Sequence, residues 1–246
     1  PRSKSHESGC RGVFFGSIMG ARKFYLALLQ LSVTTNKSEN LRNAWIHVKR
    51  AASSGAEVIC MSPTFGYSSD TLKNLKLYAE TIPGETSDML SSIARKNGIY
   101  LVGVAVGLSQ EVRFAPLAHI YADLGCKLLV FPGSFNTALN PLRWDLLQRA
   151  RAIDNQIYVA SVSAARTQDA PYGSCGRSML IDPQGDVVQS AGHDEAVVMA
   201  EVDLDHLSSV RKETPIRKHH RHDLYAVVNR QRNEDDREFF KNVFFV

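Results

Sequence analysis

Short apolar runs suited to buried strands alternate with helix-forming segments along most of this chain. Residues 24–33 (FYLALLQLSV) and 56–61 (AEVICM) are continuous apolar runs, which is the pattern of strands that are covered on both faces. Between them, a helix capped by Asn36 or Ser38 carries apolar side chains at helical spacing. Strands that alternate with helices over this length form layers of sheets and helices. The sequence therefore predicts an α/β layered fold with mixed sheets.

The alternation continues to the end of the apolar patterning. Further strands are predicted over residues 99–108, 127–131, 157–163, 178–181, 186–189 and 195–202. Further helices are predicted from Thr86 to Gly98 and over residues 114–124, 141–155 and 204–211. The first helix should bury a stripe formed by Leu41, Trp45, Val48 and Ala52. The run 99–108 is unusually long for one strand, and Asp182-Pro183-Gln184-Gly185 predicts a hairpin turn.

The composition of the 246 residues excludes several classes of protein. With 44% hydrophobic and 22% charged residues, the chain has the material for a sizeable core. It has no run of 18 apolar residues, and its net charge of +4 is mild, so we expect neither a membrane nor a nucleic-acid partner. Four widely spaced cysteines (Cys10, Cys60, Cys126 and Cys175) predict free thiols and no metal site. A reducing, cytoplasmic setting fits best, with the mitochondrion as the alternative.

The two ends of the chain differ from its middle. Residues 1–22 begin with Pro1 in place of Met and are rich in Ser, Gly and Arg. We expect a disordered extension on a fragment, a processed product or an incomplete gene model; a transit peptide is the alternative. Residues 229–246 combine a charge run with a Phe/Val cluster and are expected to form a C-terminal tail. The predicted domain therefore spans residues 23–228.

Two motifs outside the strand ends suggest chemistry but favour simpler interpretations. Gly173-Ser174-Cys175-Gly176 is similar to a nucleophile elbow, yet it lacks the G-x-S-x-G spacing and leads into a strand, so it predicts a turn. His219, His220, His222 and Asp223 lie within a basic run. Adjacent side chains point apart on a helix or strand, so a solvated basic face is favoured over a metal site.

Polar residues at strand ends are the better candidates, because α/β folds place their chemistry where strands meet loops. The three such ends are Ser62-Pro63-Thr64, Ser109-Gln110-Glu111 and Phe131-Pro132-Gly133-Ser134. Ser109 could be a nucleophile if a neighbouring base took its proton, and Glu111 is a candidate for that base. The alternative is that Ser109 only caps a helix.

Nine stretches, taken in order along the chain, carry a family resemblance. They are Leu28–Leu31, Ile82–Thr86, Gly98–Gly103, Arg113-Phe114, Leu128–Gly133 with Phe135-Asn136, Asn140-Pro141, Trp144–Val159, Asp182-Pro183 and Arg221–Tyr225. On these stretches, residues 24–228 resemble the nitrilase (carbon–nitrogen hydrolase) superfamily, closest to its omega-amidase branch. The resemblance implies a four-layer α-β-β-α sandwich that forms a homodimer and uses no cofactor. It also implies hydrolysis of the distal amide of α-ketoglutaramate or α-ketosuccinamate by a Glu base, a Cys nucleophile and an oxyanion-binding Lys.

The chain departs from the family at all three of these positions. Thr64 stands where the family has the general base Glu, and Ser109 stands where it has the nucleophilic Cys. The segment that carries the Lys is missing between the third strand and the nucleophile strand, which explains the over-long run at 99–108. Groups that act as one unit leave little activity when all are lost. We therefore predict a pseudoenzyme with the fold of a hydrolase.

Binding can survive better than catalysis in such a chain. The resemblance implies that Gln110, Arg113, Phe135 and Asn136 bind a small dicarboxylate-like ligand. Two alternatives stay open: a residual amide hydrolase that uses Ser109, and a non-functional product of a truncated gene copy.

Overall fold

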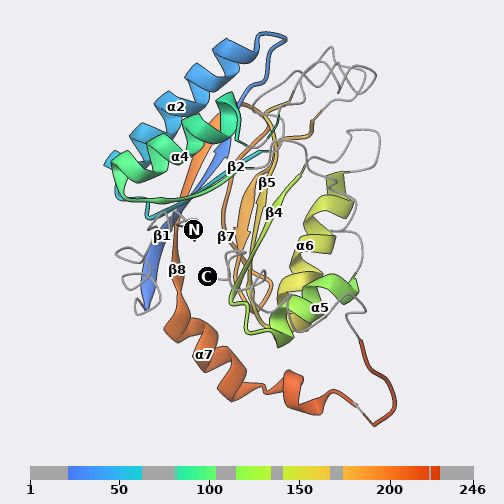
Figure 1. Ribbon diagram of the computed structural model, residues 1–246. Coiled ribbons are helices and arrows are strands. Elements are labelled where there is room, and N and C mark those ends of the chain that lie inside the picture. The colour runs from blue at the N-terminus through green and yellow to red at the C-terminus, as the bar shows by residue number, and fades with distance from the viewer. Residues whose placement is uncertain are drawn as a thin grey trace, which may run out of the picture.

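The structure is a computed structural model that describes residues 22–62, 81, 83–103, 115–133, 141–166, 174–221 and 223–227. Strands and helices alternate along the chain as the sequence predicts, and the strands form two four-stranded sheets (Figure 1). Within the ranges just given, no helix has the length and apolar character that a membrane span requires.

The first sheet has the strand order β3-β2-β1-β8. Its strands are β1 (Lys23–Gln30), β2 (Val58–Met61), β3 (Tyr100–Val102) and β8 (Ala196–Asp203). The first three are parallel to one another, and β8 runs antiparallel to β1 along the whole length of both strands. All four side chains of β2 and the last five of β1 are buried, as their continuous apolar runs predict.

The second sheet has the order β4-β5-β6-β7. Its strands are β4 (Leu128–Pro132), β5 (Tyr158–Val162), β6 (Met179–Ile181) and β7 (Val187–Ser190). β4 and β5 are parallel, whereas β6 and β7 form the predicted antiparallel hairpin. The N–H of Gly185 donates to the carbonyl oxygen of Asp182 at 3.0 Å and closes the turn.

Helices cover the outer face of each sheet (Figure 1). The helices are α2 (Lys37–Ser53), α4 (Glu85–Asn97), α5 (Ala115–Asp123), α6 (Pro141–Asn155), α7 (Leu204–Glu213) and the 3-10 helix η4 (Ile216–His219). The Asn36 side chain caps α2 by accepting a hydrogen bond from the N–H of Glu39 at 3.1 Å, as predicted. Gly98 ends α4 in the left-handed conformation, with φ of 63°.

Three apolar clusters show how the layers pack on one another. One lies between the sheets and joins Leu28 of β1 to Leu180 of β6. The next residue, Leu29, points to the opposite face of the same strand and packs with Val48 of α2. A third cluster joins Trp144 of α6 to strands β4 and β5. The layer order is therefore helix, sheet, sheet, helix, which confirms the predicted α-β-β-α sandwich.

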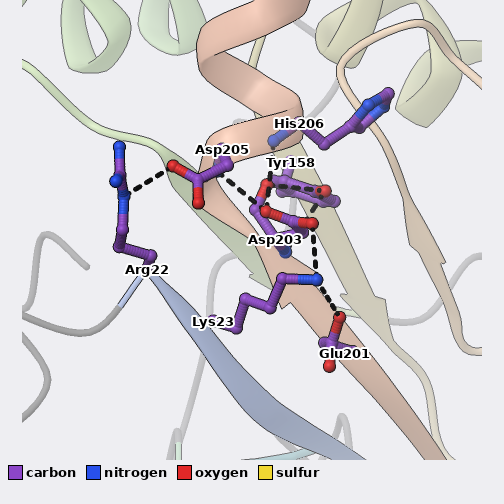
Figure 2. A network of polar contacts seen from close by, with 7 residues as sticks. All are labelled: Arg22, Lys23, Tyr158, Glu201, Asp203, Asp205 and His206. Carbon is purple, nitrogen blue, oxygen red and sulfur yellow. Dashed lines mark hydrogen bonds and ion pairs between the residues drawn. The ribbon is translucent and has the colours of Figure 1, made fainter.

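A polar network joins the two sheets at the amino end of β1 (Figure 2). The Asp203 carboxylate caps α7 by accepting hydrogen bonds from the N–H groups of Asp205 and His206 at 2.8 and 3.1 Å. It also lies 2.9 Å from Lys23 Nζ, and this hydrogen bond from Lys23 holds the pKa of Asp203 below its ordinary value. The Tyr158 hydroxyl, from the second sheet, donates to the carbonyl oxygen of Asp203 at 3.0 Å.

Two details of the predicted helices are wrong. Trp45 is 40% exposed and lies outside the buried stripe of α2, where its ring packs under Lys49 Nζ at 5.4 Å. Thr86 does not cap α4, because the helix begins at Glu85 with Gly84 at the cap position. The N–H of Gly84 instead donates to Ser87 Oγ at 2.8 Å.

The long strand predicted over 99–108 is also shorter in the structure. β3 ends at Val102, and Gly103 already lies outside it. Residues 104–110 lie outside the described part of the chain. Because α5 begins at Ala115, twelve residues (103–114) connect β3 of the first sheet to the helix that precedes β4 of the second.

Candidate functional site

The carboxyl ends of the parallel strands of both sheets meet at one edge of the molecule (top of Figure 1). The N–H of Ala165, just after β5, donates to the carbonyl oxygen of Leu31, just after β1, at 3.0 Å. This bond ties the two sheets together where their strands end. We call this place the strand-end edge; it is where layered α/β folds bind their ligands.

The six residues that the sequence places in the site lie outside the described residues. They are Thr64, Ser109, Gln110, Arg113, Phe135 and Asn136. The described ranges before them end at Ser62, Gly103 and Gly133, directly after β2, β3 and β4. Each predicted site residue therefore follows the carboxyl end of a parallel strand. How the six side chains lie relative to one another stays a prediction.

Gln30, at the end of β1, is the centre of a buried polar network at the strand-end edge. Its side chain is fully buried, and its Nε2 donates to the carbonyl oxygens of Gly192 at 3.0 Å and Asp194 at 2.6 Å. Its Oε1 accepts from the backbone N–H of Ser178 at 2.8 Å and from Ser178 Oγ at 2.9 Å. The amide thus uses both donors and both acceptor positions, which is what a buried amide needs in order not to destabilise the fold.

The network continues into the second sheet through Ser163, which follows β5. The N–H of Ser163 donates to Ser178 Oγ at 2.9 Å, and both serines are buried. We call Gln30, Ser163 and Ser178 the Gln30 seam. It joins β1 of one sheet to β5 of the other at the strand-end edge.

A glycine next to the seam is required by close packing. Gly176 has a φ of +68°, and a Cβ at this position would lie 2.8 Å from the carbonyl oxygen of His193 and 2.9 Å from Gln30 Nε2. Both the left-handed backbone and the contact distances exclude a larger residue without rearrangement. Gly176, the last residue of the predicted turn, therefore packs against the seam.

Sequence analysis did not identify the seam. One local signal was present, since Gln30 is a polar residue within an otherwise apolar strand that is buried on both faces. Its partners, however, are Ser178 and the carbonyl groups of Gly192 and Asp194, which are about 150 residues away in the sequence. Neither spacing nor periodicity connects residues that far apart.

Two carboxylates near the strand-end edge are both engaged. Asp145 of α6 pairs with Arg177, whose Nη2 lies 2.5 Å from Asp145 Oδ2. Glu195 accepts hydrogen bonds from the N–H of Ser32 at 2.7 Å and from Asn43 Nδ2 at 3.1 Å. Both acids therefore have specific partners within the described residues.

The cysteines that the structure describes are poor nucleophiles. Cys60, Cys126 and Cys175 are free and buried. Burial raises the pKa of Cys60 and of Cys126 to about 12, and it also raises the pKa of Cys175. Since the thiolate is the reactive form, these side chains act as small apolar groups.

Comparison with known families and proteins identifies the relatives of this chain. The carbon-nitrogen hydrolase family matches residues 25–110 and 103–212. Omega-amidase NIT2 of Danio rerio is 38% identical, with 83% of this chain and 97% of that protein covered. Omega-amidase NIT2 of Xenopus tropicalis is 35% identical over 274 positions, with 85% of this chain and 99% of that protein covered.

Solved structures of similar proteins have the same fold. Saccharomyces cerevisiae Nit3, a member of the nitrilase superfamily, matches with a TM-score of 0.72 and 26% identity, covering 82% of this chain and 97% of that one. The NitFhit protein of Caenorhabditis elegans matches with a TM-score of 0.75 and 21% identity, covering 86% of this chain and 68% of that one.

The alignments also show that this chain is shorter than its relatives. The Xenopus tropicalis alignment spans 274 positions but includes only about 209 of the 246 residues of this chain. About 65 of its positions therefore have no counterpart in this chain. The two family matches meet at residues 103–110, between β3 and α5. The sequence predicts a missing segment at this same place. The chain belongs to the carbon–nitrogen hydrolase family, with omega-amidases among its relatives.

Proposed function

We propose that this chain is a catalytically inactive relative of the omega-amidases that binds a small dicarboxylate-like ligand at the strand-end edge. One observation carries the proposal. β3 ends at Val102 and α5 begins at Ala115, so only residues 103–114 are available between them. These twelve residues contain neither lysine nor cysteine. In a family that places its oxyanion-binding Lys and its nucleophilic Cys in this part of the chain, both functions are lost together.

The remaining residues at these positions are chemically weak substitutes. Thr64, at the position of the general base, has a hydroxyl that does not accept a proton near neutral pH. Ser109, at the position of the nucleophile, needs such a base before it can attack an amide. Amide hydrolysis also needs a group that stabilises the tetrahedral oxyanion, and removal of a single such donor costs about 10²- to 10³-fold in rate. With all three changed together, we expect no useful turnover.

The described part of the strand-end edge supplies no evident replacement for the lost groups. Asp145 and Glu195 are held by their partners, as above. The buried thiols of Cys60 and Cys175 have raised pKa values, so they cannot take over the nucleophilic role at neutral pH. These contacts support the proposed loss of catalysis.

Ligand binding depends on different residues, which the chain keeps. Arg113 stands in the Arg-Phe pair shared with the family, and Phe135 and Asn136 follow β4. A guanidinium group is well suited to bind a carboxylate through two parallel hydrogen bonds, in a bidentate geometry. The relatives named omega-amidases support a ligand of the α-keto-dicarboxylate type.

We further propose that the protein is a homodimer in a reducing compartment such as the cytoplasm. Leu146 and Ile153 lie seven residues apart on α6 and are 55% and 45% exposed. Two exposed apolar side chains two turns apart on one helix face support burial against a second copy. The free, buried thiols support the reducing compartment.

Ammonia release from α-ketoglutaramate tests the loss of catalysis. The natural protein, Ser109→Ala, and a double variant with Ser109→Cys and Thr64→Glu should all give the same background rate, because the Lys segment is missing from each. Turnover by the natural protein that disappears in Ser109→Ala would contradict the proposal and favour a residual hydrolase. Turnover only in the double variant would show that the absent segment is not needed.

Thermal denaturation in the presence of α-ketoglutarate tests the binding function separately. A ligand that binds only the folded state raises stability by about 2.7 kcal/mol at 100 times its Kd. We expect an increase in Tm for the natural protein and for Ser109→Ala, and none for Arg113→Ala. Equal curves with and without ligand would contradict binding at this site, and the absence of a cooperative transition would favour a non-functional gene product.

A further inference from the structure

The inner face of α6 carries a polar side chain within an apolar layer. Trp144, Gln148 and Ala152 follow one another at intervals of four residues, so they lie on one face of the helix. They are 3%, 0% and 0% exposed, respectively. Trp144 and Ala152 belong to the apolar cluster between α6 and the second sheet. The Gln148 amide is therefore enclosed in the protein interior between two apolar neighbours.

Within the part of the chain that the structure describes, the Gln148 amide makes no hydrogen bond. Both its Oε1 and its Nε2 are buried and without a partner. This is the opposite of Gln30, whose amide makes four hydrogen bonds. Buried polar groups that lack a protein partner are normally satisfied by an ordered water molecule.

A second pair of buried polar atoms also lacks hydrogen-bond partners. One belongs to Asp145, one turn before Gln148 on α6, and the other belongs to Arg177. Asp145 and Arg177 are joined by a single contact, between Oδ2 and Nη2. The other carboxylate oxygen, Asp145 Oδ1, and the guanidinium Nε of Arg177 are buried and have no partner. Since Asp145 and Gln148 are three residues apart, they are neighbours on the helix surface. Trp144 Nε1 donates to the carbonyl oxygen of Arg177 at 2.9 Å and keeps residue 177 against this turn of α6.

These atoms define the chemistry of what can bind them. Asp145 Oδ1 and Gln148 Oε1 are acceptors, whereas Arg177 Nε and Gln148 Nε2 are donors. An anion would be repelled by the Asp145 carboxylate, and a cation such as ammonium would be repelled by the Arg177 guanidinium. A small neutral molecule that both donates and accepts hydrogen bonds suits both sets of atoms, and water is the smallest such molecule.

We propose that Asp145, Gln148 and Arg177 hold internal water between α6 and the segment around residue 177. The bound water satisfies the Gln148 amide and bridges Asp145 Oδ1 to Arg177 Nε. It connects α6 to the segment that packs on the Gln30 seam. The site is independent of the proposed function, because it does not involve Thr64, Ser109 or a ligand at the strand-end edge.

A crystal structure of the natural protein at a resolution that shows ordered water tests the proposal, together with Gln148→Met. We expect water density within about 2.7–3.2 Å of a Gln148 amide atom in the natural protein. It should be lost in Gln148→Met, whose side chain has nearly the same shape but no amide. The control Gln189→Met changes an exposed glutamine of β7 and should leave the density in place.

Each outcome either supports or overturns the proposed water site. No water density at Gln148, or an amide that is bonded directly to a protein group, would overturn the site. If Gln148→Met does not fold, the structure of the natural protein decides alone. A long-lived water contact to the Gln148 side-chain NH2, measured by water–amide NMR cross-relaxation in solution, would support the site, and its absence would count against it.

Discussion

Both ends of β1 lie where the two sheets contact each other, but the side chains that make the contacts differ in charge and burial. At the Lys23 end, charges link β1 to β8 of the same sheet and the Tyr158 hydroxyl reaches across from the second sheet (Figure 2), whereas at the Gln30 end a buried neutral amide joins the two sheets. The Lys23 side chain is 53% exposed, and Gln30 is completely buried. Exposed ion pairs are weakened by water and salt and contribute little. A buried amide costs much when its partners are lost. The comparison indicates that the neutral end of β1 stabilises the fold more than the charged end.

Removing the amide at Gln30 should have the largest effect. Gln30→Ala leaves the buried N–H of Ser178 without its partner and removes the hydrogen bonds from the amide to the carbonyl oxygens of Gly192 and Asp194. We expect the free energy of unfolding to fall by about 3 kcal/mol or more, measured by chemical denaturation. The control Gln189→Ala, at an exposed position of β7, should change it by less than about 0.5 kcal/mol. A loss below about 1 kcal/mol for Gln30→Ala would contradict the importance of the seam.

Crowding the seam should have the next largest effect. Gly176→Ala places a Cβ 2.8 Å from the carbonyl oxygen of His193 and imposes a left-handed backbone on a residue with a side chain. We expect a loss of about 2–4 kcal/mol in the free energy of unfolding. Gly192→Ala is the matched control, because nothing lies within 4 Å of a Cβ there. Similar losses for the two variants would argue against close packing at Gly176.

A smaller effect is expected at Tyr158, which joins the sheets at the Lys23 end. Tyr158→Phe removes the hydrogen bond to the carbonyl oxygen of Asp203 and should cost about 1 kcal/mol. Burial raises the pKa of Tyr158 to about 12, above its ordinary value of 10. The contribution of this tyrosine is therefore complete below pH 10 and is lost as the pH rises from 10 to 12. In Tyr158→Phe this part of the alkaline loss of stability, measured by thermal denaturation, should be absent.

The exposed ion pair should have the smallest effect. The hydrogen bond from Lys23 lowers the pKa of Asp203, so its contribution is complete above the ordinary carboxyl pKa of about 4 and decreases as the pH falls below it. Lys23→Met should reduce this small pH dependence, since the N–H groups of Asp205 and His206 still lower the Asp203 pKa, and should change the Tm at pH 7 very little. A large drop in the Tm of Lys23→Met at neutral pH, with or without added salt, would mean that the charged end of β1 stabilises the fold as much as the seam does.

Local patterns predicted most of the fold. The cap at Asn36, the left-handed Gly98 and the hairpin turn each depend on residues close together in the sequence, and all three are confirmed. Trp45 was misplaced because its spacing puts it at the border of the buried stripe, where the contacts of the folded protein decide exposure. Its ring still has a local partner, Lys49, four residues on.

Sequence analysis predicted less of the candidate site than of the fold. The Gln30 seam depends on partners that only the folded chain brings together, so no local pattern marks it. Thr64 and Ser109 were identified by family resemblance, and their roles stay predictions. A missing segment was predicted because the apolar run at 99–108 is too long for one strand, and the short connection from β3 to α5 is consistent with that prediction.

The most direct test of the central claim is ammonia release from α-ketoglutaramate by the purified, folded protein, measured beside omega-amidase NIT2 of Danio rerio. We expect no ammonia above the rate of Ser109→Ala, because in the proposed account the base, the nucleophile and the oxyanion-binding Lys are all replaced or missing. Turnover by the natural chain that Ser109→Ala abolishes would contradict the loss of catalysis and make Ser109 a working nucleophile.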